Sequence, residues 1–130
     1  MSWGTLLERK TILLLDDAAE MHLLIKKALE PMQVNFIPSF NERDLIANII
    51  NNVSTLSLVL LDVYMPEKDG FAVFQAIKDR FVTRKFKVAF LTGAKEKNVV
   101  MQGLGLKADA YIIKPFTVED FRDKVRKIVG

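Results

Sequence analysis

The segment that decides the fold is residues 58–70, which read LVLLDVYMPEKDG. It opens with the apolar run Leu58–Leu61, reaches an aspartate at Asp62, and ends in Asp69-Gly70 after Pro66. An uninterrupted apolar run of this kind is typical of a strand that is covered on both faces, as in a parallel sheet. The segment therefore predicts a buried strand that ends at Asp62, followed by a loop.

Working outward from this segment, four more short apolar stretches predict strands: Thr11–Leu15, Val34–Ile37, Val88–Leu91 and Ala110–Ile113. The second of these contains the polar Asn35, which fits the edge of a sheet better than its centre. Pro31 and Pro38 lie on either side of it, and both are interpreted as breaks in regular structure.

The segments between the predicted strands carry apolar residues at helical spacing, one stripe in each. Four of these stripes are Met21/Leu24/Ile25/Ala28, Leu45/Ile46/Ile49/Ile50, Phe71/Phe74/Ile77/Phe81 and Val118/Phe121/Val125/Ile128. The last helix has Thr117 and Asp120 at the spacing of an N-terminal cap. A fifth helix, Lys95–Leu106, has few apolar residues and is predicted to be thinly anchored and movable.

Strict alternation of strands and helices predicts a doubly wound α/β fold of the flavodoxin-like kind. Right-handed crossovers place helices on both faces of a five-stranded parallel sheet, and the expected strand order is 2-1-3-4-5. Ligands of such sheets bind at the carboxyl ends of the strands, near the first and third. The candidate functional residues should therefore lie at that edge.

Charged and polar residues follow the predicted strands at this edge. The first strand runs into Asp16-Asp17 and the third into Asp62, so the expected order brings three carboxylates together. Carboxylates in this number repel each other unless a pKa rises or a cation binds, and hard oxygen ligands suit Mg²⁺ better than zinc. Separate turn or cap roles for the three aspartates are the alternative.

Two further residues come from the neighbouring strands, Thr92 after the fourth and Lys114 after the fifth. An ammonium group, a hydroxyl and a metal together can hold a phosphoryl group, and a carboxylate can be the nucleophile that accepts it. Asp62 is the best acceptor candidate because it ends a central strand, with Asp16 and Asp17 as metal ligands.

These residues occur in four motifs: Asp16-Asp17, Asp62-x-x-Met65-Pro66-x-x-Asp69-Gly70, Leu91-Thr92-Gly93 and Tyr111-x-x-Lys114-Pro115-Phe116. In this order, at these strand ends, the chain resembles the receiver domain of bacterial two-component response regulators, including stand-alone chemotaxis receivers. The resemblance runs from about Lys10 to Val129. It divides the chain into an N-terminal extension, residues 1–9, and a receiver domain, residues 10–130.

The resemblance implies that a histidine kinase, a phosphotransfer protein or a small phosphodonor transfers a phosphoryl group to Asp62. Mg²⁺ would be held by Asp17, Asp62 and the backbone carbonyl of Tyr64, with Asp16 acting through water. Thr92 and Lys114 would contact the phosphoryl group, and the Lys114-Pro115 bond would be cis.

The resemblance also implies how the signal leaves the domain. Thr92 moves toward the phosphoryl group and the ring of Tyr111 turns inward, which reshapes a face made by the fourth helix, fifth strand and fifth helix. That face would bind a downstream protein, or a second copy of the chain on phosphorylation. Its basic residues, which favour an acidic partner where they are exposed, are Lys95, Lys97, Lys107, Arg122 and Arg126.

Some positions depart from the family pattern or carry no role. Lys107 stands where a glycine commonly precedes the Ala-Asp-x-Tyr stretch, so the turn there is expected to be strained. His22, the only histidine, is interpreted as a surface residue of the first helix.

Three other functions compete with the phosphoreceiver. A phosphatase of the haloacid dehalogenase type would need a second aspartate two residues after Asp62, where this chain has Tyr64, so the chain is not expected to be an enzyme beyond self-catalysed transfer and slow autodephosphorylation. The second is a phosphate-independent interaction module. The third is the receiver half of a DNA-binding regulator, whose further domain the sequence neither shows nor excludes.

Composition sets the remaining expectations. With 130 residues, 50% of them hydrophobic, and no cysteine, the chain is expected to form one packed domain without disulfides. It has no apolar stretch of membrane-spanning length, which predicts a cytoplasmic protein. The net charge of +3 is compatible with nucleic acid, but the basic residues near the C-terminus alternate with an apolar stripe, so direct nucleic-acid binding is not expected.

Overall fold

The computed structural model describes residues 9–65, 68–93, 105 and 107–130. Five parallel strands form one sheet in the order β2-β1-β3-β4-β5, as predicted. The strands are β1 (Thr11–Leu15), β2 (Asn35–Ser39), β3 (Leu56–Asp62), β4 (Lys87–Gly93) and β5 (Ala110–Lys114).

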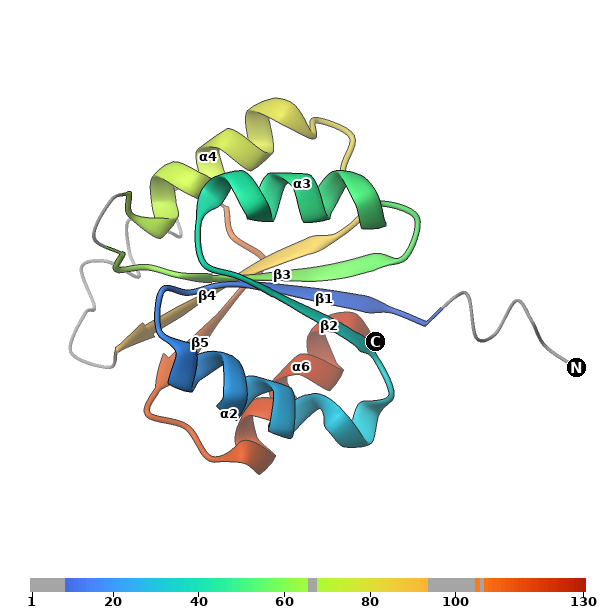
Figure 1. Cartoon of the computed structure of the whole chain (residues 1–130), viewed down its shortest axis with the longest axis vertical. Helices are drawn as coiled ribbons and strands as arrows, with labels where there is room; N and C mark the ends of the chain where they lie inside the picture. The colour runs from blue at the N-terminus through green and yellow to red at the C-terminus, as the bar shows by residue number, and fades with distance from the viewer. Residues whose placement is uncertain (1–8, 66–67, 94–104, 106) are drawn as a thin grey trace, which may run out of the picture.

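Helices cover both faces of this sheet. They are α2 (Ala19–Leu29), α3 (Glu42–Asn52), α4 (Gly70–Arg80) and α6 (Val118–Val129), with a short 3-10 turn, η1 (Glu30–Met32), after α2. Helices α3 and α4 lie on one face of the sheet, and α2 and α6 lie on the other (Figure 1). Except for Gly105, which is helical, the predicted helix Lys95–Leu106 lies outside the described residues.

The core consists of two layers because side chains of a strand alternate between the faces of the sheet. In β1, Leu13 and Leu15 pack with α3 and α4, whereas Ile12 and Leu14 pack with α2 and α6. All four side chains are fully buried, which accounts for the continuous apolar run in the sequence. The predicted amphipathic character of the last helix is confirmed, since Phe121 and Val125 are buried.

Strand β2 shows where the prediction needs correction. Its edge position is confirmed, but Pro38 does not break the strand; it lies within β2 and pairs with Leu14 of β1. Proline is tolerated in a strand that has a neighbour on one side only, because one row of its backbone groups needs no partner. Pro31 does mark a break, since it lies in η1 at the end of α2.

Local backbone features agree with two more predictions. The Thr117 hydroxyl accepts a hydrogen bond from the Asp120 N–H at 3.0 Å and caps α6. Lys107 has a φ of +63°, in the left-handed region that glycine adopts without strain. The predicted strain before β5 is therefore present.

The turn between β3 and α4 depends on a glycine. A Cβ on Gly70 would clash with the backbone carbonyl of Asp62, and the Gly70 N–H donates to the Val63 carbonyl at 2.8 Å. Asp69 caps the helix by accepting from the Ala72 N–H at 2.8 Å. The Asp69-Gly70 pair thus packs the start of α4 directly against the strand end that carries Asp62.

Candidate functional site

Three carboxylates meet at the carboxyl edge of the sheet, as the strand order predicts. Asp62 is the last residue of β3, and Asp16 and Asp17 follow β1, its neighbour in the sheet. One carboxylate oxygen of each residue lies within 4.8 Å of the others. Asp16 and Asp62 are buried, with 1% and 7% exposure, and Asp17 is exposed, so the cluster opens toward solvent on one side.

Lys114 reaches this cluster from the end of β5. Its ammonium nitrogen is 3.2 Å from Asp62 Oδ1 and 3.8 Å from Asp16 Oδ2. The bond from Lys114 to Pro115 is cis, as the resemblance implies. One lysine cannot neutralise three carboxylates, so the site keeps a net negative charge.

Burial raises the pKa values of two of these aspartates. The pKa of Asp62 is raised by desolvation and then by the charge of Asp16, while Lys114 opposes the shift. The pKa of Asp16 is raised by desolvation, with the Ala18 N–H and Lys114 opposing it. Ionising either carboxyl group therefore costs free energy at this site, and a bound cation would remove that cost.

The donor set fits a hard divalent cation. Asp16 Oδ2 is fully buried and has no hydrogen-bond partner among the described residues, although its other oxygen accepts from the Ala18 N–H at 2.9 Å. A buried acceptor without a donor is costly unless a cation or an ordered water binds it. Mg²⁺ prefers carboxylate oxygens and retains several waters, which an acidic cluster open on one side permits.

The remaining predicted residues lie around the cluster. Thr92 lies near the end of β4 and is 2% exposed. Leu91, the residue before Thr92, pairs with Asp62 of β3. The Tyr64 backbone acts against the raised pKa of the Asp62 carboxyl group, and the Tyr64 side chain is 57% exposed. The predicted role of the Tyr64 carbonyl as a metal ligand stays a prediction.

Tyr111 lies in β5, half-buried, and stacks on Phe90 of β4 with ring centroids 5.8 Å apart. Its hydroxyl is buried and has no hydrogen-bond partner within the described part of the chain. Burial raises the pKa of this phenol, so the hydroxyl is neutral in its packed position. The ring is thus directed into the layer beneath α3 and α4, in contact with the strand that carries Thr92.

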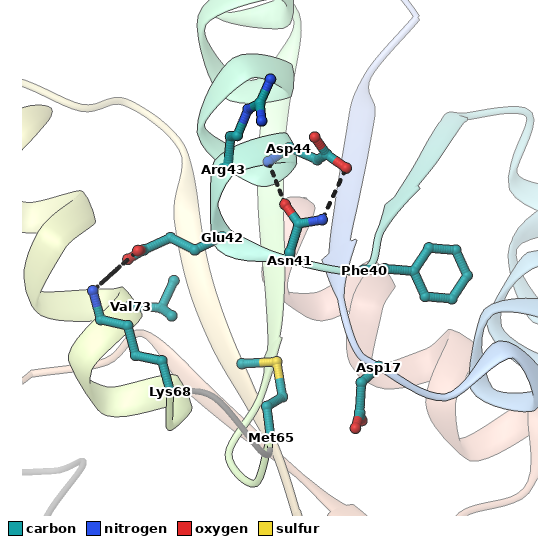
Figure 2. Close-up of a pocket in the computed structure, with 9 residues that line it drawn as sticks. All are labelled: Asp17, Phe40, Asn41, Glu42, Arg43, Asp44, Met65, Lys68 and Val73. Atoms are coloured by element: carbon teal, nitrogen blue, oxygen red, sulfur yellow. Dashed lines mark hydrogen bonds and ion pairs between the residues drawn. The ribbon is translucent and has the colours of Figure 1, made fainter.

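A groove of about 920 Å³ opens beside Asp17, lined by residues of the segment after β2, the start of α3 and the loop after β3. Figure 2 shows the Lys68–Glu42 ion pair, 2.8 Å long, joining the loop after Asp62 to α3. Both partners are partly exposed, so the pair adds little to stability. It does place a charged bridge at the rim of the groove, a feature that the sequence did not predict.

One prediction about an individual residue is wrong. His22 is not a surface residue: it is 7% exposed, with Nε2 2.8 Å from the carbonyl oxygen of Asp16. His22 precedes the buried Ile25 by three residues, a helical spacing from which its burial could have been predicted. Arg122 is half-buried, and its Nε donates to the Ala28 carbonyl at 2.8 Å, which ties α6 to α2.

With the site in place, comparison with known proteins identifies the family. The response regulator receiver domain matches residues 12–126, and the chain belongs to that family. Receiver domains of two-component systems take phosphoryl groups from histidine kinases.

Two curated relatives illustrate the range of proteins that contain such a domain. The chain is 32% identical over 122 residues to histidine kinase P4 of Formosa agariphila, covering 94% of this chain and 9% of that protein. It is 29% identical over 120 residues to the phosphate regulon transcriptional regulatory protein PhoB of Pseudomonas aeruginosa, covering 92% and 52%. The chain therefore spans only part of each of these longer relatives.

Solved structures agree with the fold. A response regulator from Thermotoga maritima superimposes with a TM-score of 0.80 at 26% identity, covering 93% of this chain and 98% of the other. The Vibrio cholerae chemotaxis protein CheY4 gives 0.81 at 18% identity, covering 92% and 98%. Among the described helices, none has both the length and the apolar character that crossing a membrane requires.

Proposed function

We propose that this receiver domain accepts a phosphoryl group on the carboxylate of Asp62. The observation that carries the proposal is the 3.2 Å contact of Lys114 Nζ with Asp62 Oδ1 at the centre of the acidic cluster. Asp62 ends β3, which lies between β1, the strand that runs into Asp16 and Asp17, and β4, the strand that carries Thr92. Of the three aspartates it also has the shortest contact with Lys114 among the ion pairs of the described residues, 3.2 Å against 3.8 Å for Asp16.

The transfer is a displacement at phosphorus. A carboxylate oxygen of Asp62 forms the new O–P bond, while the P–N bond to a phosphohistidine of a kinase or phosphotransfer protein breaks. The electron pair of that bond stays with the imidazole nitrogen. The imidazole takes up one proton and leaves as neutral histidine. Lys114 offsets the charge of the incoming group, and the Thr92 hydroxyl donates to one of its oxygens.

We assign the metal site to Mg²⁺ held by Asp17, Asp62 and the Tyr64 carbonyl, with Asp16 acting through water. Mg²⁺, when bound, supplies positive charge that neutralises the phosphoryl oxygens and lowers the barrier to attack by an anion. The unpartnered oxygen of Asp16 and the raised pKa values of Asp16 and Asp62 support this assignment. The chain needs no further cofactor for this chemistry.

The output follows from the same residues. Thr92 and the ring of Tyr111 form the switch that carries the signal from Asp62 to the output face. They are linked through β4, because Tyr111 stacks on Phe90, and Phe90 lies two residues before Thr92 in that strand. The output face comprises the segment 95–106, β5 and α6, and it binds a downstream protein or a second copy of the chain. Since Arg122 is engaged with α2, the exposed Lys107 and Arg126 are the basic residues that would meet an acidic partner.

The activity of the whole protein does not follow from the receiver domain alone. PhoB is by name a transcriptional regulator and P4 a histidine kinase, and this chain matches only part of each. Either a downstream protein contacts the domain directly, or a further domain of the same protein does. We place the protein in the cytoplasm, where kinases of this kind act, and expect no direct contact with nucleic acid by residues 10–130.

The test is the intact mass of the protein after incubation with acetyl phosphate and Mg²⁺. The wild-type protein should gain one phosphoryl group, and Asp62→Asn should gain none. Asp69→Asn is the matched control, because that residue lies outside the cluster and asparagine preserves its cap on α4. Phosphorylation of Asp62→Asn to the wild-type level would refute the proposal, as would no gain in the wild-type protein.

A further inference from the structure

The only histidine of the chain is buried against the site without belonging to it. His22 lies in the first part of α2, and its Nε2 is 2.8 Å from the backbone carbonyl oxygen of Asp16. A carbonyl oxygen can only accept, so the ring must carry a hydrogen on Nε2. His22 is therefore the donor in this hydrogen bond, and the Asp16 carbonyl is the acceptor.

The carbonyl that His22 binds belongs to the peptide unit between Asp16 and Asp17. A peptide unit is planar, so fixing its oxygen also fixes its N–H and the two Cα atoms that it joins. These are the Cα atoms of two of the three clustered aspartates. The orientation of one peptide plane thus fixes the two Cα positions from which both carboxylates project.

Other contacts hold the rest of Asp16. Its N–H donates to the Ser39 carbonyl of β2 at 3.2 Å, and its Oδ1 accepts from the Ala18 N–H at 2.9 Å. With the carbonyl held by His22, only Oδ2 is left without a hydrogen bond among the described residues. That oxygen is the one that faces Lys114, at 3.8 Å.

The imidazole ring of His22 also packs against an aromatic ring. Phe40, in the segment between β2 and α3, packs on it with ring centroids 4.2 Å apart and planes inclined by 39°. Phe40 and Asp17 both line the groove of Figure 2, with the phenyl ring above the aspartate in that view. Phe40 is 54% exposed, and its contact with His22 is one that buries part of its ring.

We propose that His22 is a positioning residue: it sets the affinity of the acidic cluster for Mg²⁺ by holding the Asp16–Asp17 peptide, without touching the ion. The proposal rests on the metal site of the proposed function and adds a residue to it. Groups that orient metal ligands from behind typically change metal affinity by tenfold or more when removed. Without His22, the peptide can rotate, and the carboxylates must be ordered again each time the ion binds.

The test is a Mg²⁺ titration of the whole chain, followed through backbone amide shifts by NMR, with no phosphodonor present. His22→Phe keeps an aromatic ring against Phe40 but removes the donor, and we expect its Mg²⁺ dissociation constant to rise about tenfold. His22→Gln returns an N–H donor near the position of Nε2, and we expect its dissociation constant to be within about threefold of the wild-type value. Phe40→Leu, which leaves the hydrogen bond in place, is the control for packing alone.

Urea unfolding of each variant in EDTA distinguishes a positioning role of His22 from a purely structural one. If the role were purely structural, the substitution would lower the unfolding free energy but leave the Mg²⁺ affinity of the folded protein unchanged. Equal Mg²⁺ affinity in wild type and His22→Phe would overturn the proposal, and so would a glutamine variant as weak as the phenylalanine variant. Should His22→Phe fail to fold, His22→Leu serves as the donor-free variant and is judged by the same criteria. A wild-type protein that binds no Mg²⁺ would instead overturn the metal assignment, and the role of His22 with it.

Discussion

Replacing Asp62 by asparagine should stabilise the metal-free protein, although it removes the proposed phosphoacceptor. At an effective dielectric constant of about 20, the attraction of Lys114 across 3.2 Å is worth about 5 kcal/mol. Repulsion by Asp16 and Asp17, each no more than 4.8 Å away, is worth about 3.5 kcal/mol apiece at that distance. Desolvation by burial is the largest cause of the raised pKa of Asp62, and together with these repulsions it outweighs the attraction of Lys114.

Solvent reduces this difference, since Asp17 is exposed. The expected gain for Asp62→Asn is therefore about 1–2 kcal/mol in unfolding free energy, measured by urea denaturation in EDTA at neutral pH. Asp69→Asn, an exposed cap, should stay within about 0.5 kcal/mol of wild type. Saturating Mg²⁺ should reverse the order, because a ligand at a hundredfold excess over its dissociation constant stabilises the wild-type protein by about 2.7 kcal/mol.

The pH dependence has a definite sign. Since the pKa of Asp62 is raised above 3.8 in the folded state, the native protein binds the proton more tightly than the unfolded chain. The destabilisation is therefore complete above the raised pKa and is relieved as the pH falls through it toward 3.8. The stability difference between wild type and Asp62→Asn should shrink over that range. A variant that is clearly less stable than wild type in EDTA would show that the Lys114 attraction dominates, which would refute the reasoning.

Three further outcomes are expected. Asp17→Ala should lose Mg²⁺ binding in a calorimetric titration yet be at least as stable as wild type in EDTA, and a clear loss of stability would reveal a structural partner of Asp17. Lys114→Ala should still accept a phosphoryl group, more slowly, but the amide exchange of β4 and β5 should no longer respond to beryllofluoride; a full wild-type response would refute its coupling role. Lys107→Gly should raise the unfolding free energy by about 1 kcal/mol, because the φ of +63° costs a lysine that much, and no change would mean that side-chain contacts offset the strain.

The parallel sheet and its edge could be predicted because they depend on local patterns. The run Leu58–Leu61 is fully buried in β3, and the strand order then brings Asp16 and Asp62 together without any knowledge of side-chain contacts. The strand itself is longer than the run, since pairing with β1 resumes at Leu56 beyond a register shift at the half-buried Ser57. An apolar pattern reports burial and not the extent of a backbone ladder.

What could not be predicted depends on contacts between distant segments. The hydrogen bond of Arg122 to Ala28 joins residues 94 positions apart, and nothing local distinguishes Arg122 from the other basic residues of its helix. The sequence around His22 predicts exposure because its neighbours on the helix include the charged Glu20 and Lys26. Its burial follows from the position of the Asp16 carbonyl and the Phe40 ring, which only the assembled fold brings to it.

The most direct test of the account is to locate the phosphoryl group in the chain. Borohydride reduces an acyl phosphate to an alcohol, so it would convert a phosphorylated aspartate into homoserine, which peptide mass spectrometry can place. After treatment with acetyl phosphate and Mg²⁺, we expect homoserine at residue 62 and at no other position. Homoserine at Asp16 or Asp17, or none in a sample whose intact mass shows phosphorylation, would contradict it.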